Sequence, residues 1–272
     1  MLASLRWLVF ALFALLINLP VIVTLVTSFK SAKEIASNAS LWIQAPTLEN
    51  YAKVLVPTDR LNLLDHLFNS FVVALIGSGL ALLLALPAAH AIARGHLGRQ
   101  TLLPLVLNLR AVPLIIFAIP IYMGFQWLGL LDTRVGLGLI LTVVNLPLAL
   151  VILVNALNDL PLELDEAARM DGAANWQILT LILTPLVRPA LVTAFIFGFV
   201  TAWNEFLFGL MLTTTKAVPV TVGASFFFAS AGGEAPLHAA AVMIVAALPP
   251  MLLGLVMYRQ ISRSLLAGAV KG

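Results

Sequence analysis

The chain has 272 residues, of which 61% are hydrophobic and 10% charged, and its formal net charge is +3. A soluble globular protein is nearer half apolar and a quarter charged, so this composition excludes an ordinary soluble enzyme and also a disordered chain. A polytopic membrane protein remains, because a transmembrane β-barrel has weakly alternating segments of about ten residues and no long apolar runs. The few lysines and arginines lie between apolar stretches, so nucleic-acid binding is not expected. Cysteine is absent, which excludes disulfides and thiolate metal sites.

Apolar runs of about 20 residues predict an all-α polytopic membrane protein with six transmembrane helices. The first run could also be a signal peptide with Arg6 as its charged start. Its apolar stretch is too long for that and no small-residue cleavage motif closes it, so we interpret it as an uncleaved span. The predicted spans cover residues 7–27, 68–92, 101–127, 135–157, 185–212 and 239–258.

Local features refine three of these spans. Residues 29–67 after the first span are polar and predict short amphipathic helices. In the second span, alanines recur every four residues and so share one helix face, where a neighbouring helix can approach closely, although alanine is also common in such spans. The third span is expected to be kinked or partly broken by prolines. These residues are Ala81, Ala85 and Ala89 in the second span and Pro104, Pro113 and Pro120 in the third.

Six spans place both termini on one side of the membrane. That side carries eight lysines and arginines and the opposite side six, four of which lie in the long 29–67 segment, where the positive-inside rule weakens. We therefore predict that both termini are cytoplasmic. The apolar segment 218–230 is too short to cross and could be re-entrant, interfacial or the start of an extended last helix.

The polar segment 158–184 is the most informative part of the chain. Pro161 can open a helix, Gly172 permits the left-handed geometry that ends one, and Asn175 is a plausible N-cap of a second helix that Pro185 closes. Five of the protein's twelve acidic residues lie here, and a solvated linker has no need of this pattern. The segment predicts a helix, a sharp turn and a second helix, exposed as a docking element for a soluble partner.

The residues of this segment resemble the EAA motif of ABC importer permeases. Glu166-Ala167-Ala168 is followed after three residues by Gly172 and then by Ile182-x-Thr184-Pro185, where the family usually has Ile-x-Leu-Pro. Further matches occur before and after this motif, in the same order as in the family. Together they are similar to the second permease of maltose-type carbohydrate importers. They are Asn69-Ser70, Ala88 to Arg94, Ile119 to Tyr122, Leu128 to Thr133, Ala202 to Phe206 and Gly268 to Gly272.

The resemblance implies a type I ABC importer permease fold in the bacterial inner membrane, with residues 1–67 as a first helix plus an extracytoplasmic segment and residues 68–272 as a core of five helices. The coupling helix at 163–172 would dock on the ATPase subunit through Glu163, Asp165, Glu166, Ala167, Ala168, Asp171 and Gly172. The expected partners are a second permease, two copies of an ATP-binding subunit, an extracytoplasmic sugar-binding protein and membrane lipid. ATP and Mg²⁺ are expected on the ATPase, with no cofactor on this chain, which has no phosphate-binding Gly-x-x-x-x-Gly-Lys loop.

Polar residues within spans are costly in lipid and often mark a pathway. Trp203, Asn204 and Glu205, expected midway along the fifth span, could stack on a sugar ring and bind its hydroxyls; hydrogen bonding between helices is the alternative. Asn108 and Arg110 in the third span are further candidates for the translocation pathway, and for Arg110 an internal structural or gating role is favoured over direct contact with the solute.

Two other functions are open to an apolar, helical chain, namely secondary transport and intramembrane catalysis. A secondary transporter often has inverted repeats and ion-coupling carboxylates at mid-membrane, but no clear repeat is found and Glu205 alone is a candidate acid. An intramembrane enzyme would need converging titratable residues within the spans, and none are found. The four histidines lie in separate segments and form no zinc motif, so neither catalytic nor metal-binding residues are predicted.

Overall fold

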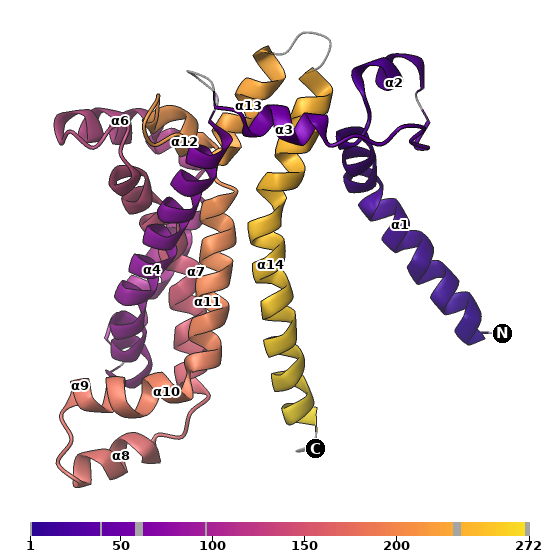
Figure 1. Cartoon of the computed structure of the whole chain (residues 1–272). Helices are drawn as coiled ribbons and strands as arrows, with labels where there is room; N and C mark the ends of the chain where they lie inside the picture. The colour runs from indigo at the N-terminus through magenta and orange to yellow at the C-terminus, as the bar shows by residue number, and fades with distance from the viewer. Residues whose placement is uncertain (1, 39, 58–61, 96, 231–234, 270–272) are drawn as a thin grey trace. The chain divides into compact units, whose positions relative to one another are not determined.

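The computed structural model describes residues 2–38, 40–57, 62–95, 97–230 and 235–269, and within these residues every regular element is a helix (Figure 1). The long helices are α1 (Leu2–Ser28), α4 (Leu63–Gly95), α7 (Arg134–Asn158), α11 (Arg188–Trp203) and α14 (Ala235–Ala269). The shorter ones are α2 (Ala32–Ser37), α3 (Glu49–Leu55), α5 (Leu102–Ala111), η1 (Leu114–Phe117), α6 (Ala118–Trp127), α8 (Glu163–Met170), α9 (Asn175–Gln177), η2 (Ile178–Leu183), α10 (Thr184–Leu186), α12 (Leu207–Leu212) and α13 (Val220–Ser230). The all-α prediction is confirmed for this part of the chain.

Four helices in the described residues are long and apolar enough to cross a membrane, namely α1, α4, α7 and α14. A fifth span is possible through α9–α10 and α11, which are bent by 79° where they meet. The third predicted span is broken, as its prolines suggested: α5 ends at Ala111 because Pro113 has no N–H and disfavours helix before it. The count of exactly six spans stays a prediction.

The chain forms two compact units. One consists of Met1–Leu67 with Val222–Leu248, and the other of Phe68–Thr221 with Pro249–Gly272. The division into 1–67 and 68–272 expected from the sequence stays a prediction. The apolar segment 218–230 forms a helix of its own, α13.

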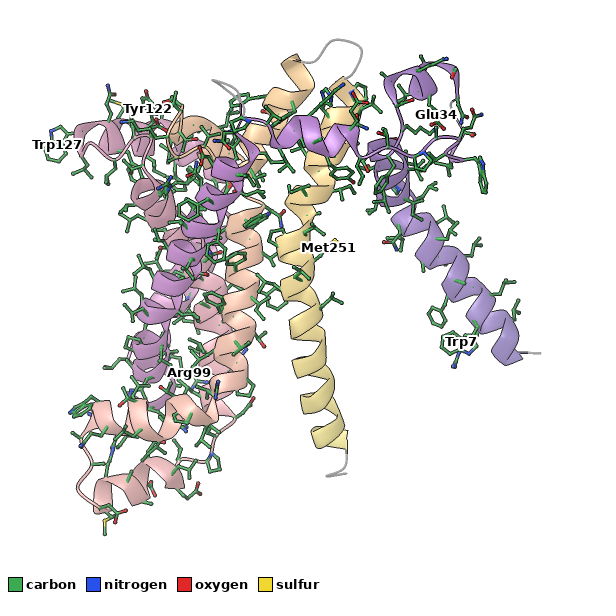
Figure 2. All side chains as sticks on the ribbon, viewed as in Figure 1. Trp7, Glu34, Arg99, Tyr122, Trp127 and Met251 are labelled. Carbon is green, nitrogen blue, oxygen red and sulfur yellow. The ribbon has the colours of Figure 1, made fainter. Side chains whose placement is uncertain are left out.

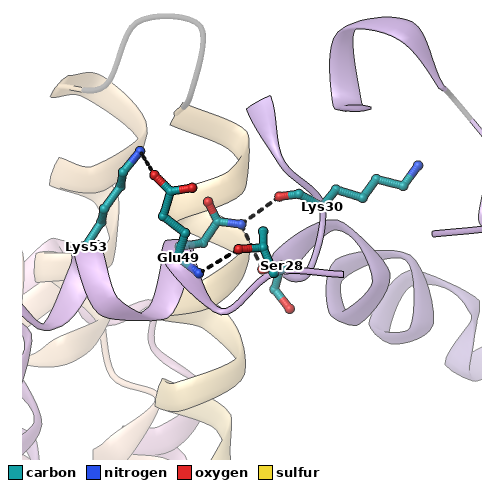
Figure 3. A network of polar contacts seen from close by, with 6 residues as sticks. Ser28, Lys30, Glu49 and Lys53 are labelled. Atoms are coloured by element: carbon teal, nitrogen blue, oxygen red, sulfur yellow. Dashed lines mark hydrogen bonds and ion pairs between the residues drawn. The ribbon is translucent and has the colours of Figure 1, made fainter. Parts of the chain in front are cut away.

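In the first unit, the chain after α1 folds back on the end of that helix. The Asn50 amide donates to the carbonyl oxygens of Ser28 and Lys30 at 2.9 and 2.8 Å, and Glu49 pairs with Lys53 at 3.0 Å (Figure 3). The N–H of Gln44 donates to the Glu34 carboxylate and lowers its pKa. The short helices expected after the first span are confirmed by α2 and α3.

Small residues allow the helices of the second unit to pack closely. Ala81, Ala85 and Ala89 of α4 are all buried, which confirms the predicted small-residue face. A side chain at Gly138 of α7 would meet the Ile76 side chain of α4 at 2.6 Å. Tyr122 and Trp127 of α6 are instead exposed and point away from their helix (Figure 2), an arrangement typical of aromatic residues at a membrane–water interface.

Candidate functional site

The first helix of the 158–184 segment is α8, which begins at Glu163. Glu163, Asp165 and Glu166 lie in its first turn, where the helix dipole favours acids, and Arg169 lies in its last turn. The prediction that Pro161 is the first helical residue is wrong. The N–H groups of Asp165 and Glu166 donate to the Leu162 carbonyl, so the helix starts later, and the Pro161 carbonyl faces the Arg94 guanidinium instead.

The sharp turn after α8 has the geometry of a Schellman motif. Gly172 has φ +85°, which confirms the left-handed conformation expected of it. The N–H of Ala173 donates to the Ala168 carbonyl at 2.9 Å, and the N–H of Gly172 donates to the Arg169 carbonyl at 3.0 Å. These two bonds satisfy carbonyls that the helix end would leave without partners, and they reverse the chain direction.

The second helix runs through α9, η2 and α10. Its N-cap is Ala174 and not Asn175 as predicted, because the Ala174 carbonyl accepts the first intrahelical bond, from the Ile178 N–H at 3.0 Å. The Gln177 side chain accepts the Ala174 N–H at 2.8 Å. Pro185 was expected to close the helix but lies within α10, and the bend comes at Val187. The wider π-helical turn of η2 precedes Pro185, and this geometry relieves the clash that a proline makes with the preceding turn.

The two faces of α8 differ in exposure. Asp165 and Ala168 are buried, and Ala168 packs in a cluster with Ile178 and Leu183 of η2. The opposite face is exposed and ends in Met170, whose exposed fraction is 89%. Five of the predicted coupling residues are exposed on this face or in the turn that follows it, namely Glu163, Glu166, Ala167, Asp171 and Gly172. The seven residues predicted to couple this chain to a partner therefore divide into two that anchor the helix and five that face outward.

A buried ion pair joins α8 to the end of α4. The Arg94 Nε lies 3.1 Å from the Asp165 Oδ2, and the two side chains are only 5% and 7% exposed. Arg94 also donates to the Leu160 carbonyl at 3.1 Å. Arg94 has no predicted role in the sequence beyond ending the second span. No local signal pairs it with Asp165, because their contact depends on how α4 and α8 pack.

At the opposite end of α11, the candidate pathway residues lie around a break in the helix. The prediction that Glu205 lies midway along the fifth span is wrong, because α11 ends at Trp203. The Glu205 carboxylate accepts the N–H of Phe208, in the first turn of α12, at 2.9 Å. Trp203 is buried and stacks on Phe199 with a centroid distance of 5.8 Å, while Asn204 is exposed.

The third-span candidates are not brought together with this group by any described contact. Asn108 of α5 is exposed, and the Arg110 side chain lies outside the described residues. Within the described part of the chain, no group of three or more histidine, aspartate and glutamate residues could hold a metal ion.

Residues 81–266 match the family described as binding-protein-dependent transport system inner membrane component. The chain belongs to this family. A sulfoquinovosyl glycerol transport system permease protein of Agrobacterium fabrum is 33% identical over 95% of this chain and 91% of its own. A trehalose/maltose transport system permease protein of Thermococcus litoralis is 34% identical, over 83% of this chain and 82% of its own.

The fold agrees with this family. The crystal structure of a bacterial ABC transporter involved in the import of the acidic polysaccharide alginate contains a chain that superposes with a TM-score of 0.78, covering 95% of each chain at 20% identity. The predicted type I ABC importer permease fold is confirmed. The protein is thus a membrane-spanning permease subunit of a binding-protein-dependent ABC importer and not an enzyme, and the alternative of a secondary transporter is excluded.

Proposed function

We propose that this permease forms half of the pathway of an importer for a sugar or sugar derivative, and that α8 couples it to an ATP-binding subunit. The named solutes of its relatives are sulfoquinovosyl glycerol, trehalose and maltose, and that of its structural neighbour is alginate, all of them carbohydrates or their derivatives. Trp203, Asn204, Glu205, Asn108 and Arg110 are the candidate pathway residues. A second permease, two ATP-binding subunits and a sugar-binding protein would complete the machine, with ATP and Mg²⁺ bound by the ATPase.

The observation that carries the coupling proposal is the division of α8 into a held face and an exposed face. A displacement of the exposed face would pass to α4 through the Arg94–Asp165 pair and to η2 through Ala168. Three exposed acids, Glu163, Glu166 and Asp171, outnumber the one exposed base of α8, Arg169, and give this surface a negative character suited to a basic cleft on the partner. A docking face that is held rigidly transmits motion better than a mobile linker.

The same end of the second unit is proposed to be cytoplasmic, with both chain termini on that side. Arg99 lies at the end of the unit that carries α8 to α10 (Figure 2), and Arg94, Arg169 and Arg188 belong to the same connections. Short connections rich in arginine favour the cytoplasmic side. In the inner membrane, this orientation would bring α8 to the compartment that contains ATP.

The coupling proposal is tested by Ala167→Arg, a change on the exposed face that leaves the ion pair intact. In the purified importer we expect loss of co-purification with the ATP-binding subunit and loss of solute uptake, with an unchanged melting temperature of the permease. Glu49→Arg is the matched control, because Glu49 is an exposed acid on α3 outside this site. Wild-type assembly and uptake in Ala167→Arg would refute coupling through α8.

The pathway and substrate proposals need separate measurements. Trp203→Ala and Glu205→Gln are expected to lower uptake, and normal uptake in both variants would remove these residues from the pathway. The solute class is tested by a calorimetric screen of sugars against the partner binding protein. Binding of amino acids or peptides, with no sugar bound, would overturn the carbohydrate assignment.

A further inference from the structure

Two motifs that the proposed function leaves unused meet at the end of the second unit opposite α8. Asn69-Ser70 lies in the second turn of α4, and the run from Leu128 to Thr133 precedes α7. Both hold the same segment, 212–220, between α12 and α13. Because α7 has 25 residues and ends near α8, this site lies about 37 Å from the coupling helix along the helix axis.

Asp132 is the centre of this contact. Its carboxylate accepts the backbone N–H groups of Thr214, Thr215, Lys216 and Ala217 at distances of 3.0 to 3.2 Å. It also accepts the hydroxyls of Thr214 and Thr215 at 3.1 and 2.9 Å. Its own N–H donates to the Leu212 carbonyl at 2.7 Å. One side chain thus satisfies four consecutive backbone donors.

This arrangement is an anion-binding nest. Successive backbone N–H groups that converge on one point form a concavity of positive potential, which proteins use to bind phosphates and other anions. Here the protein supplies the anion itself. Only an ionised carboxylate fits well, since all of its hydrogen-bonding sites accept, whereas an amide would turn an NH₂ group toward these donors.

The backbone of Asp132 is adapted to this contact. Its φ is +55°, and it is the sole non-glycine residue with positive φ among the described residues. Aspartate tolerates this conformation better than most side chains, but it is still uncommon. The strain is compensated by the hydrogen bonds that the carboxylate makes in this orientation.

Asn69 complements Asp132 from the other direction. Its side-chain amide donates to the carbonyls of Lys216 and Val218 at 3.1 and 2.9 Å, and its oxygen accepts from the Arg134 Nε at 2.6 Å. Asn69 is only 1% exposed. The Ser70 hydroxyl accepts the N–H of Val220 at 2.8 Å. Donors and acceptors of the turn are therefore both held by fixed side chains.

We propose that Asp132 is a built-in anion that closes a nest in the 214–217 turn, and that it acts as the positioning residue that fixes this end of the permease for uptake of solute. The positioning role in uptake rests on the proposed function, because this end of the permease is extracytoplasmic only if α8 is cytoplasmic. Asp132 acts through the turn, since its own carboxylate is occupied by the turn's N–H groups. The site is expected to bind a small carboxylate when the aspartate side chain is removed.

The test uses the assembled importer with Asp132→Gly, Asp132→Asn and the control Glu49→Gln. Glycine accepts a positive φ without strain, so Asp132→Gly removes the carboxylate alone. In Asp132→Gly we expect amide exchange at 214–217 to become about tenfold faster or more, and the rate of solute uptake to fall about tenfold or more. A factor of this size corresponds to the loss of one charge-assisted hydrogen bond. Sodium formate should restore both readouts in Asp132→Gly, and sodium chloride at equal ionic strength should not.

Formate is expected to fail in Asp132→Asn, because the amide still fills the nest. Unchanged amide exchange in Asp132→Gly, or equal effects of formate and chloride, would overturn the built-in anion. Faster exchange with normal uptake would overturn the positioning role. If the proposed importer function fails instead, wild-type uptake of sugars is absent while the exchange and formate readouts still test the nest, so the two failures are distinguishable.

Discussion

Arg94 and Asp165 form a buried ion pair, 3.1 Å between Nε and Oδ2, that ties the end of α4 to the helix proposed to receive the ATPase. The attraction between buried charges is offset by the cost of removing them from water, so such a pair is weak evidence for stability by itself. Its value here is positional, because α8 has few other polar ties to the rest of its unit among the described contacts. Removing one partner leaves the other buried without its counter-charge.

Asp165→Leu is therefore expected to destabilise the permease by about 3–5 kcal/mol, whereas Arg94→Met combined with Asp165→Leu should recover most of this loss. The measurement is the melting temperature of the detergent-purified permease. Lys53→Met breaks the exposed pair with Glu49 and should cost less than about 1 kcal/mol. A single Asp165→Leu variant as stable as Lys53→Met would show that the pair does not anchor α8.

Gly172→Ala tests the turn that ends α8. A Cβ at this position meets no atom within 4 Å, so the expected cost of about 1–2 kcal/mol comes from the left-handed backbone alone. Gly124→Ala in α6 also has free space but ordinary helical geometry, and it should be neutral or slightly stabilising. Equal thermal shifts for the two variants would contradict this assignment.

The two adjacent alanines of the motif should respond differently to enlargement. Ala168→Leu overpacks the cluster with Ile178 and Leu183, and we expect a loss of about 1–3 kcal/mol in stability. Ala167→Leu lies on the exposed face and should leave the melting temperature unchanged while it weakens binding of the ATP-binding subunit. Surface plasmon resonance on the purified permease measures the binding. The reverse pattern would mean that α8 faces its partner with the other side.

The contact of Asp132 should persist in mild acid. Burial by itself raises the pKa of Asp132, but the N–H groups of Thr214, Lys216 and Ala217 outweigh it and hold the pKa well below its ordinary value. A carboxyl group whose pKa is depressed in the folded state stabilises the fold at every pH above its unfolded pKa of about 4. This stabilisation is lost only as the pH falls through the pKa of the folded state. Exchange protection at 214–217, corrected for intrinsic rates, should therefore be equal at pH 8 and pH 5. A loss of protection at pH 5 would contradict this pKa.

Local patterns in the sequence predicted local structure well. The acids of the first turn and Gly172 predicted α8 and its turn, because a helix dipole and a left-handed residue act within a few residues of themselves. The exact helix starts were wrong by one or two residues, as at Ala174, whose carbonyl already accepts the Ile178 N–H. Glu205 was expected midway along one span, but it lies between α11 and α12, where its carboxylate accepts the Phe208 N–H of the next helix.

The sequence alone determined that this is an apolar, helical membrane protein with one acidic helix–turn–helix, because composition and short-range spacing decide these properties. Only the tertiary structure decided that Asp165 is paired with Arg94, that Ala168 packs on Ile178 while Ala167 stays exposed, and that Asp132 fills a nest in a turn far along the chain. These contacts join residues distant in sequence. Their existence depends on how helices pack, and no local pattern records that packing.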